Sequence, residues 1–213
     1  MALEFIKDIT IRKHYLLKLW WDRKSGFLEQ SGWIRSFEER KCVDADGQPV
    51  PWLTYSLNKI LDNRLGKEVK VYEFGSGFST LFFAKRVKHV YTIEYDKKWY
   101  DLLIGQLPEN TTIDFSEFEQ PGYVANIIDV PELFDLIVID GRRRNECAAN
   151  AINKVAEGGV IIFDDTHRDK YREGTKLIED LGYKRLDFWG FVNGSIDLKC
   201  TSVFYKANNI LNI

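Results

Sequence analysis

A glycine-rich segment at residues 73–80 reads Glu-Phe-Gly-Ser-Gly-Phe-Ser-Thr and combines residue types that bind small ligands. Gly75 and Gly77 allow a tight turn and a close approach of the backbone to a ligand. A helix that starts after them would offer unpaired N–H groups in its first turn. Glu94 ends the next apolar run, and its carboxylate could accept hydrogen bonds from both hydroxyls of a ribose. Together these residues predict a nucleoside-binding site.

The residues around the two glycines distinguish among three kinds of enzyme that bind ribose in this way: nicotinamide enzymes, methyltransferases and aminopropyl-transferring enzymes. A dinucleotide fingerprint has Gly or Ala three positions after its second glycine, where this chain has Thr80. Glu73 would face the pyrophosphate of a dinucleotide, but it suits a ligand that carries a cationic amino acid. A nicotinamide-dependent oxidoreductase and a catalytically silent nucleotide-binding module stay open as alternatives, because a fold alone does not choose among them.

Three carboxylates, Asp140, Asp164 and Asp165, end two apolar runs that should form adjacent strands. Adjacent strands lie about 5 Å apart, so these side chains could converge on Mg²⁺ or another divalent cation, which prefers oxygen ligands. Such a cation would lower the pKa of an acceptor hydroxyl and fix its oxygen in place. Asp164 and Asp165 could both face one ion only if the chain bends between them. In the alternative interpretation, these two aspartates cap the helix that follows.

Two further features could act on an acceptor. An imidazole can accept a hydroxyl proton near pH 7, so His167 joins Asp140 as a candidate catalytic base. The run Arg142, Arg143 and Arg144 could orient an anionic acceptor, such as a phosphate or carboxylate, through bidentate bonds. Alternatively, the run lies at the solvent-exposed N-terminus of a helix, where its positive charges oppose the helix dipole and favour an acidic partner.

The scaffold for these residues is predicted by alternating strand-like and helix-like patterns in residues 67–213. Apolar runs without alternation, such as residues 136–139, are typical of central parallel strands covered on both faces. The last two strand-like runs have no helix between them and predict an antiparallel pair. We therefore expect an α/β, Rossmann-like doubly wound sheet, which binds ligands at the carboxyl ends of its strands. Strands are expected at 69–74, 90–94, 112–115, 136–140, 160–164, 184–188 and 201–205, and helices at 79–86, 97–106, 145–157 and 169–181.

Residues 1–66 are expected to form a helical cap or lid in front of this domain. A helix is predicted over residues 9–23, an irregular segment over 31–51, and a second helix over 55–65 with Thr54 as its N-cap. Aromatic rings in this part could close over a cofactor, stack on a sugar or aromatic acceptor, or pack against the domain. They are Trp20, Trp21, Trp33, Trp52 and Tyr55.

From residue 68 to residue 205 the sequence resembles the class I S-adenosylmethionine-dependent methyltransferases, whose first motif has the form acidic-x-Gly-x-Gly. The resemblance extends to Glu94 as the ribose acid and to the runs 134–141 and 158–165 as the fourth and fifth strands. It implies that Glu73, Ser79 and Thr80 hold the methionine portion of S-adenosylmethionine. The stretch 115–118 matches the family only loosely, so we assign no adenine contact. The implied cofactor-binding set is Glu73, Gly75, Ser76, Gly77, Ser79, Thr80, Glu94 and Asp140.

The aspartates extend this resemblance to the metal-dependent O-methyltransferases, which place an Asp after the fourth strand and an Asp-Asp or Asp-Asn pair after the fifth. Asp140, Asp164 and Asp165 match that pattern. The resemblance therefore implies methyl transfer to a hydroxyl of a small-molecule acceptor. The segment 50–55 loosely resembles bacterial methyltransferases associated with surface polysaccharide synthesis, which favours a sugar as that acceptor.

The amino-acid composition indicates which kinds of partner the protein binds and in which compartment it lies. The chain has 30 basic and 32 acidic residues and a net charge of −2, so no global positive field exists to hold a nucleic acid. Its three cysteines lack the even number of a disulfide framework and the spacing of a zinc site, which favours a reducing cytoplasm. We expect no signal sequence and no transmembrane segment, and the oligomeric state is not indicated.

Overall fold

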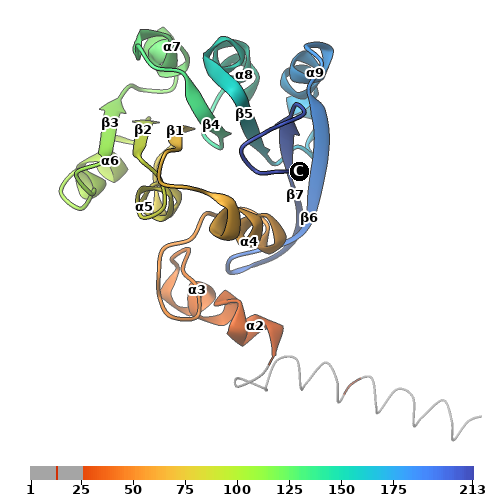
Figure 1. The fold of residues 1–213 in the computed structure, drawn as a ribbon. Helices are drawn as coiled ribbons and strands as arrows, with labels where there is room; N and C mark the ends of the chain where they lie inside the picture. The colour runs from red at the N-terminus through yellow and green to blue at the C-terminus, as the bar shows by residue number, and fades with distance from the viewer. Residues whose placement is uncertain (1–12, 14–25) are drawn as a thin grey trace, which may run out of the picture.

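The structure, a computed structural model, describes Lys13 and residues 26–213. The helix expected over residues 9–23, with Trp20 and Trp21, lies outside the described residues except for Lys13. Within the described part of the chain, seven strands form one sheet in the order β3-β2-β1-β4-β5-β7-β6 (Figure 1). The strands are β1 Lys70–Phe74, β2 His89–Glu94, β3 Thr111–Phe115, β4 Phe134–Ile139, β5 Val155–Asp164, β6 Lys184–Val192 and β7 Ser195–Tyr205.

Strand direction in this sheet agrees with the predicted fold class. β1 pairs in parallel with β2 and with β4, and β4 pairs in parallel with β5. β7 is antiparallel to both β5 and β6, so the C-terminal pair closes the sheet as expected. The central strands are apolar on both faces because helices cover both, and Leu136, Ile137, Val138 and Ile139 of β4 are all buried. The Rossmann-like doubly wound fold is thereby confirmed.

Helices cover the sheet on two sides and create two hydrophobic cores (Figure 1). The helices α4, α5 and α6 lie on one face, and α7, α8 and α9 on the other. The first core joins Leu57 and Leu61 of α4 to Val71 of β1, and the second joins Tyr123 of α7 to Phe74 of β1. The bounds are α4 Tyr55–Arg64, α5 Phe78–Ala84, α6 Lys97–Leu103, α7 Pro121–Asp129, α8 Arg144–Ala151 and α9 Arg172–Asp180, with 3-10 turns η1 Ile152–Lys154 and η2 Asp169–Tyr171.

Several elements differ from the sequence-based expectations. The helix α7 was not predicted, and it starts with proline at its first position, where a missing N–H costs nothing. The expected helix over 145–157 ends at Ala151, and β5 begins at Val155 instead of 160. Thr54 is the N-cap of α4, as predicted, although its buried hydroxyl makes no hydrogen bond.

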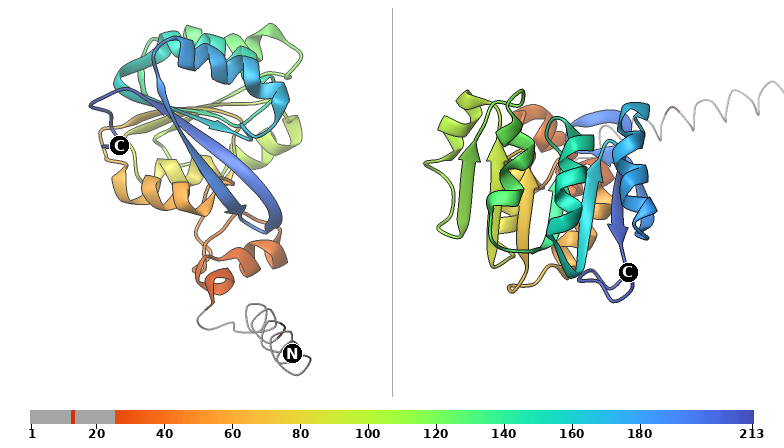
Figure 2. Two further views of the ribbon diagram at one scale, coloured as in Figure 1. Left: turned by 90° about the vertical axis from the view of Figure 1, so that its right-hand side faces the viewer. Right: turned by 90° about the horizontal axis from the view of Figure 1, so that it is seen from above.

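The segment before α4 packs against the tip of the β6–β7 hairpin, which runs past the other strands (Figure 2). It contains two short helices, α2 Phe27–Gln30 and α3 Trp33–Glu39, where an irregular run was expected from residue 31. The indole N–H of Trp33 donates to the carbonyl of Ser195 at 2.9 Å, and that of Trp52 donates to the carbonyl of Asn193 at 3.0 Å. These bonds fix Trp52 next to the sheet.

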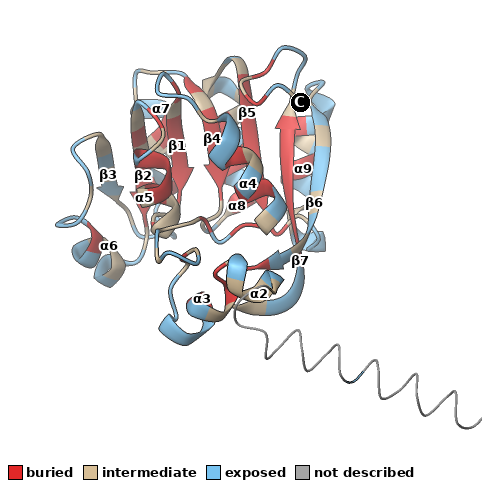
Figure 3. Ribbon diagram, turned by 60° about the horizontal axis from the view of Figure 1, so that its bottom comes forward, coloured by how far each residue is buried: buried red, intermediate tan, exposed pale blue. Residues whose placement is uncertain are grey.

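Burial follows the same architecture (Figure 3): the central strands are buried, whereas much of the hairpin is exposed on either side of its buried tip residues Val192 and Asn193. The boundary expected at residue 66 stays a prediction, although α4 already belongs to the core of the sheet. Among the described residues, no helix is long and apolar enough to cross a membrane.

Candidate functional site

The candidate site lies between the carboxyl ends of β1 and β4. The strand order reverses at this point of the sheet, and open α/β sheets bind their ligands at such a topological switch point. The two strand ends approach closely through glycines. Gly75 has a φ of +95°, and a Cβ on it would lie 3.1 Å from the Cα of Gly141. A Cβ on Gly141 would lie 1.9 Å from the hydroxyl of Tyr123. Both glycines are therefore required by the fold at this point.

Glu73 is the last residue but one of β1, beneath the glycine loop, and is fully buried. Its Oε2 accepts a hydrogen bond from the Thr80 hydroxyl at 2.5 Å, and that hydroxyl oxygen accepts the N–H of Gly77 at 2.9 Å. Its other oxygen, Oε1, is buried without a hydrogen-bond partner. Burial raises the pKa of Glu73 to about 7, although hydrogen bonds from nearby hydroxyls oppose the rise. Glu73 thus holds the loop and keeps one oxygen free for a donor.

Glu94 ends β2 and supports the same loop from the other side. Its Oε2 accepts the N–H of Ser76 at 2.9 Å and the Ser76 hydroxyl at 2.5 Å. Its Oε1 accepts the N–H groups of Tyr95 and Asp96, both at 2.8 Å. The side chain is only 2% exposed, and a carboxylate has about four acceptor positions. A ribose hydroxyl would therefore have to replace the Ser76 hydroxyl to reach Glu94.

The residues of the loop fit the cofactor implied by the resemblance. The free oxygen of Glu73 matches a donor such as the ammonium group of an amino acid. Gly77 is extended, with a φ of 165°, and a Cβ there would meet only the Trp99 indole at 3.8 Å. The described fold therefore does not require glycine at residue 77. Ser79 lies in the first turn of α5 and is partly exposed.

The three aspartates come together as predicted, but around an arginine. The Arg144 guanidinium lies 2.9 Å from Oδ1 of Asp140 and 3.5 Å from Oδ2 of both Asp164 and Asp165. It also donates to the carbonyls of Asp140, Gly141 and Asp164. Asp165 has a φ of +60°, and this left-handed turn is the bend that lets neighbouring aspartates face one group. Arg144 is only 7% exposed.

The same carboxylates have further cationic partners. Asp165 lies 3.1 Å from Nη2 of Arg168 and 3.5 Å from Nζ of Lys199, while Asp164 accepts the Thr201 hydroxyl at 2.5 Å. Burial and the nearby Asp164 raise the pKa of Asp140 well above its ordinary value, although Arg144 opposes the rise. The Asp140 side chain remains 26% exposed.

As they lie, the three aspartates do not fit a divalent cation. Arg144 occupies the position between them, and three positive side chains balance their three charges. Among the described residues, no group of three or more His, Cys, Asp or Glu side chains is arranged to hold a metal ion. The capping alternative is wrong too, because the N-cap of α9 is Tyr171 and that of η2 is Arg168. We derive no catalytic step through a metal.

A cavity of about 300 Å³ opens beside this cluster. Its acidic and aromatic lining comprises Asp140, Asp164, Asp165, Trp52, Tyr95 and Tyr171. Trp52 also lines a larger cavity of about 640 Å³ between α3 and the hairpin tip, but that cavity lies away from the strand ends. The smaller cavity is therefore the one that adjoins the predicted chemistry.

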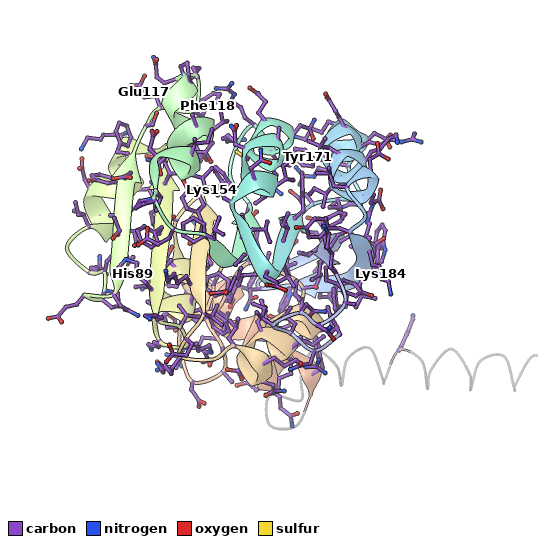
Figure 4. All side chains as sticks on the ribbon, turned by 45° about the horizontal axis from the view of Figure 1, so that its top comes forward. His89, Glu117, Phe118, Lys154, Tyr171 and Lys184 are labelled. Atoms are coloured by element: carbon purple, nitrogen blue, oxygen red, sulfur yellow. The ribbon has the colours of Figure 1, made fainter. Side chains whose placement is uncertain are left out.

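His167 is not brought into this cavity. It is exposed, its Nδ1 accepts the N–H of Cys200 at 3.3 Å, and its ring lies 6.1 Å from that of Trp189 on the hairpin. His89, the first residue of β2, lies at the opposite end of the sheet edge from Glu117 and Phe118 (Figure 4). Of the two candidate bases, only Asp140 faces the cavity.

Sequence reasoning missed three residues of the site. The run of three arginines does not distinguish Arg144 from its two neighbours. Lys199 precedes residue 201, at which the last strand is predicted to begin. Tyr95 has no role in the sequence-based predictions. Tyr95 follows Glu94 directly, and its position after a strand end was the signal that could have found it. Phe118, in the stretch with the loose family match, contacts the Tyr95 ring at 5.9 Å between centroids.

Comparisons with known proteins show the fold. No protein-family model and no curated protein matches the chain. Among solved structures, precorrin 8w decarboxylase of Methanobacterium thermoautotrophicum is 17% identical, with a TM-score of 0.54, over 79% of this chain and 98% of that one. Precorrin-6y C5,15-methyltransferase of Geobacter metallireducens is 15% identical, with a TM-score of 0.55, over 70% and 85% of the two chains.

A third similar structure is a Streptococcus mutans protein, described as a methyltransferase and solved with S-adenosylhomocysteine. It is 13% identical, with a TM-score of 0.50, and the match covers 70% of this chain and 94% of that one. Identities this low establish architecture and not activity. The chain has the fold of the class I S-adenosylmethionine-dependent methyltransferases.

Proposed function

We propose that the protein binds S-adenosylmethionine on the loop after β1 and transfers its methyl group to a hydroxyl of a small molecule in the adjoining cavity. The observation that carries this proposal is the pair of buried glutamates under the glycine loop. Glu73 and Glu94 hold the loop from both sides, and Oε1 of Glu73 is left without a partner. A ligand with a cationic amino acid supplies the donor that Oε1 of Glu73 lacks, and a ribose of the same ligand reaches Glu94 by replacing the Ser76 hydroxyl.

The cavity supports the acceptor side of the proposal. When bound, S-adenosylmethionine supplies an electrophilic methyl group on a sulfonium, which leaves as the thioether once the acceptor oxygen has bonded the methyl carbon. Asp140 lines the cavity, and no described residue donates to its Oδ2. This oxygen accepts the proton that the hydroxyl loses, so a methyl ether, S-adenosylhomocysteine and a protonated Asp140 result. Arg144 holds the other oxygen of Asp140 and orients it.

The size and charge of the protein support a small acceptor. A cavity of about 300 Å³ takes a metabolite and not a folded polymer, and the net charge of −2 gives no general attraction for nucleic acid. Lys199 lies over the Trp52 ring at 4.4 Å, and the other face of this ring is a flat apolar surface of the kind that stacks on sugars. The free thiols of Cys42, Cys147 and Cys200 are in keeping with a reducing cytoplasm, which is part of the proposal.

The experiment follows tritium from the methyl group of labelled S-adenosylmethionine into three fractions: dialysable small molecules, protein and nucleic acid. We expect label in the small molecules. Gly77→Val should lose both transfer and S-adenosylhomocysteine binding, because its side chain takes the space where the loop backbone would meet the ligand, whereas a Cβ there meets only the Trp99 indole at 3.8 Å. Asp140→Asn should keep binding and lose transfer.

Gly105→Val is the matched control, because a Cβ at residue 105 meets nothing within 4 Å. It should behave like the parent. Label that appears in nucleic acid alone would overturn the small-acceptor part of the proposal. Normal binding by Gly77→Val would overturn the assignment of the loop.

A further inference from the structure

The three consecutive arginines after β4 point in three directions. Arg143 pairs with Glu146 and donates to the carbonyls of Phe118 and Gln120, away from the cavity. Arg144 turns inward to the aspartates. Arg142 is exposed on the lining of the cavity, and its backbone N–H is fixed by the Tyr123 hydroxyl at 3.0 Å. Only one of the three arginines is therefore available to a ligand.

Arg142 has no carboxylate partner among the described residues. Its guanidinium lies over the Tyr95 ring, 5.3 Å from the ring centre. Lys170, from η2, is likewise exposed on the cavity lining without a described carboxylate partner, and its Nζ lies 4.8 Å from the centre of the Tyr171 ring. In Figure 4, Tyr171 lies between α8 and α9. Two cations thus rest on aromatic rings of one cavity.

The charges of this cavity leave a positive surplus. Its lining contains Asp140, Asp164 and Asp165, and these pair with Arg144, Arg168 and Lys199. Arg142 and Lys170 have no such partner, so the lining carries an excess of two positive charges in a chain whose net charge is −2. A cavity with a net positive charge attracts anionic ligands and raises their local concentration.

We infer that Arg142 and Lys170 form a subsite for an oxyanion, and that the methyl acceptor carries a phosphate or carboxylate group there. This inference rests on the proposed function, because it concerns the acceptor of that reaction. Arginine binds planar and tetrahedral oxyanions through two parallel N–H bonds, and lysine adds a point charge. With its anionic group at this subsite, the acceptor reaches Asp140 with a hydroxyl and lies against Trp52.

The test is calorimetry with inorganic pyrophosphate, and separately with the dicarboxylate succinate, in the presence of saturating S-adenosylhomocysteine. The parent should bind at least one of the two, and which one identifies the type of oxyanion. The double variant Arg142→Gln with Lys170→Gln should lose at least tenfold in that affinity. Its affinity for S-adenosylhomocysteine should stay within twofold of the parent's, because neither residue contacts the glycine loop.

Arg143→Gln is the matched control, since it removes the same charge one residue along but outside the cavity. It should leave anion binding within twofold. An equal loss in Arg143→Gln would mean general charge attraction and would overturn the subsite. Loss of S-adenosylhomocysteine binding in the double variant would assign the two cations to the cofactor and overturn it as well. A parent that binds pyrophosphate but no S-adenosylhomocysteine would refute the proposed function and leave the anion site in place.

Discussion

The titration of Glu73 should control both the stability of the protein and its affinity for the cofactor. The carboxyl is fully buried, and its pKa rises from an ordinary 4.5 to about 7 because burial disfavours the charged form. A raised pKa in the folded state means that the folded protein binds the proton more tightly than the unfolded chain does. The contribution of Glu73 to stability is therefore fully present below pH 4.5 and is lost as the pH rises to 7.

The size of this loss follows from the two pKa values. They differ by 7 − 4.5 = 2.5, and each pH unit of such a difference corresponds to about 1.36 kcal/mol. Because Glu73 is not exposed, solvent screening does not reduce the result. The free energy of unfolding should thus fall by about 3 kcal/mol between pH 4.5 and 8 from this group alone.

Urea unfolding of the parent and of Glu73→Gln over this pH range measures the loss. Glutamine keeps an acceptor for the Thr80 hydroxyl but does not titrate, so the variant should gain stability relative to the parent as the pH rises. Burial, Asp164 and Asp165 raise the pKa of Asp140 in both proteins, so their effect cancels in the difference, and only the part that Glu73 itself contributes remains. Parallel stability curves for the two proteins would refute the reasoning.

The pH dependence of S-adenosylhomocysteine binding gives a second measurement of the Glu73 titration. If the free oxygen of Glu73 faces the ammonium group of the cofactor, binding favours the charged carboxylate. The affinity for S-adenosylhomocysteine should then fall by up to tenfold per pH unit below pH 7 in the parent and stay flat in Glu73→Gln.

Three further predictions concern the loop, the strand ends and the aspartates. Glu94→Ala should lower the free energy of unfolding by about 3 kcal/mol and weaken S-adenosylhomocysteine binding, because it leaves backbone donors of two loops unpaired; urea unfolding and calorimetry measure the two effects. Gly141→Ala should cost about 1–3 kcal/mol in the same unfolding assay, and adding Tyr123→Phe should recover part of it, since the hydroxyl is the closest obstacle. Arg144→Ala should gain Mn²⁺ binding, seen by electron paramagnetic resonance and as a rise in Tm, whereas the parent and Arg142→Ala should show none; Mn²⁺ binding by the parent would restore the metal hypothesis.

The sheet and the strand-end residues could be predicted because their signals are local. Unbroken apolar runs such as residues 136–139 identify central strands, and the residues that end parallel strands must meet at one edge. Glu73, Glu94 and Asp140 were placed in this way. The helix α7 escaped prediction because its Pro-Gly start resembles a turn in sequence.

The partner of the aspartates could not be predicted, because it depends on backbone geometry that the residue types do not encode. Arg143, as the N-cap of α8, has a left-handed φ of +48°, and this turn sends its two neighbours in opposite directions. Asp165 is left-handed as well, with a φ of +60°. Three identical arginines in a row therefore have three different surroundings, and only the folded chain shows that Arg144 takes the position expected for a metal.

The central claim is that the loop over Glu73 and Glu94 binds S-adenosylmethionine and not a dinucleotide. Calorimetry of the parent protein with S-adenosylhomocysteine and with NAD⁺, side by side at pH 8 where Glu73 is charged, tests it most directly. We expect one S-adenosylhomocysteine to bind per chain and NAD⁺ to give no detectable heat. Tighter binding of NAD⁺ would contradict it.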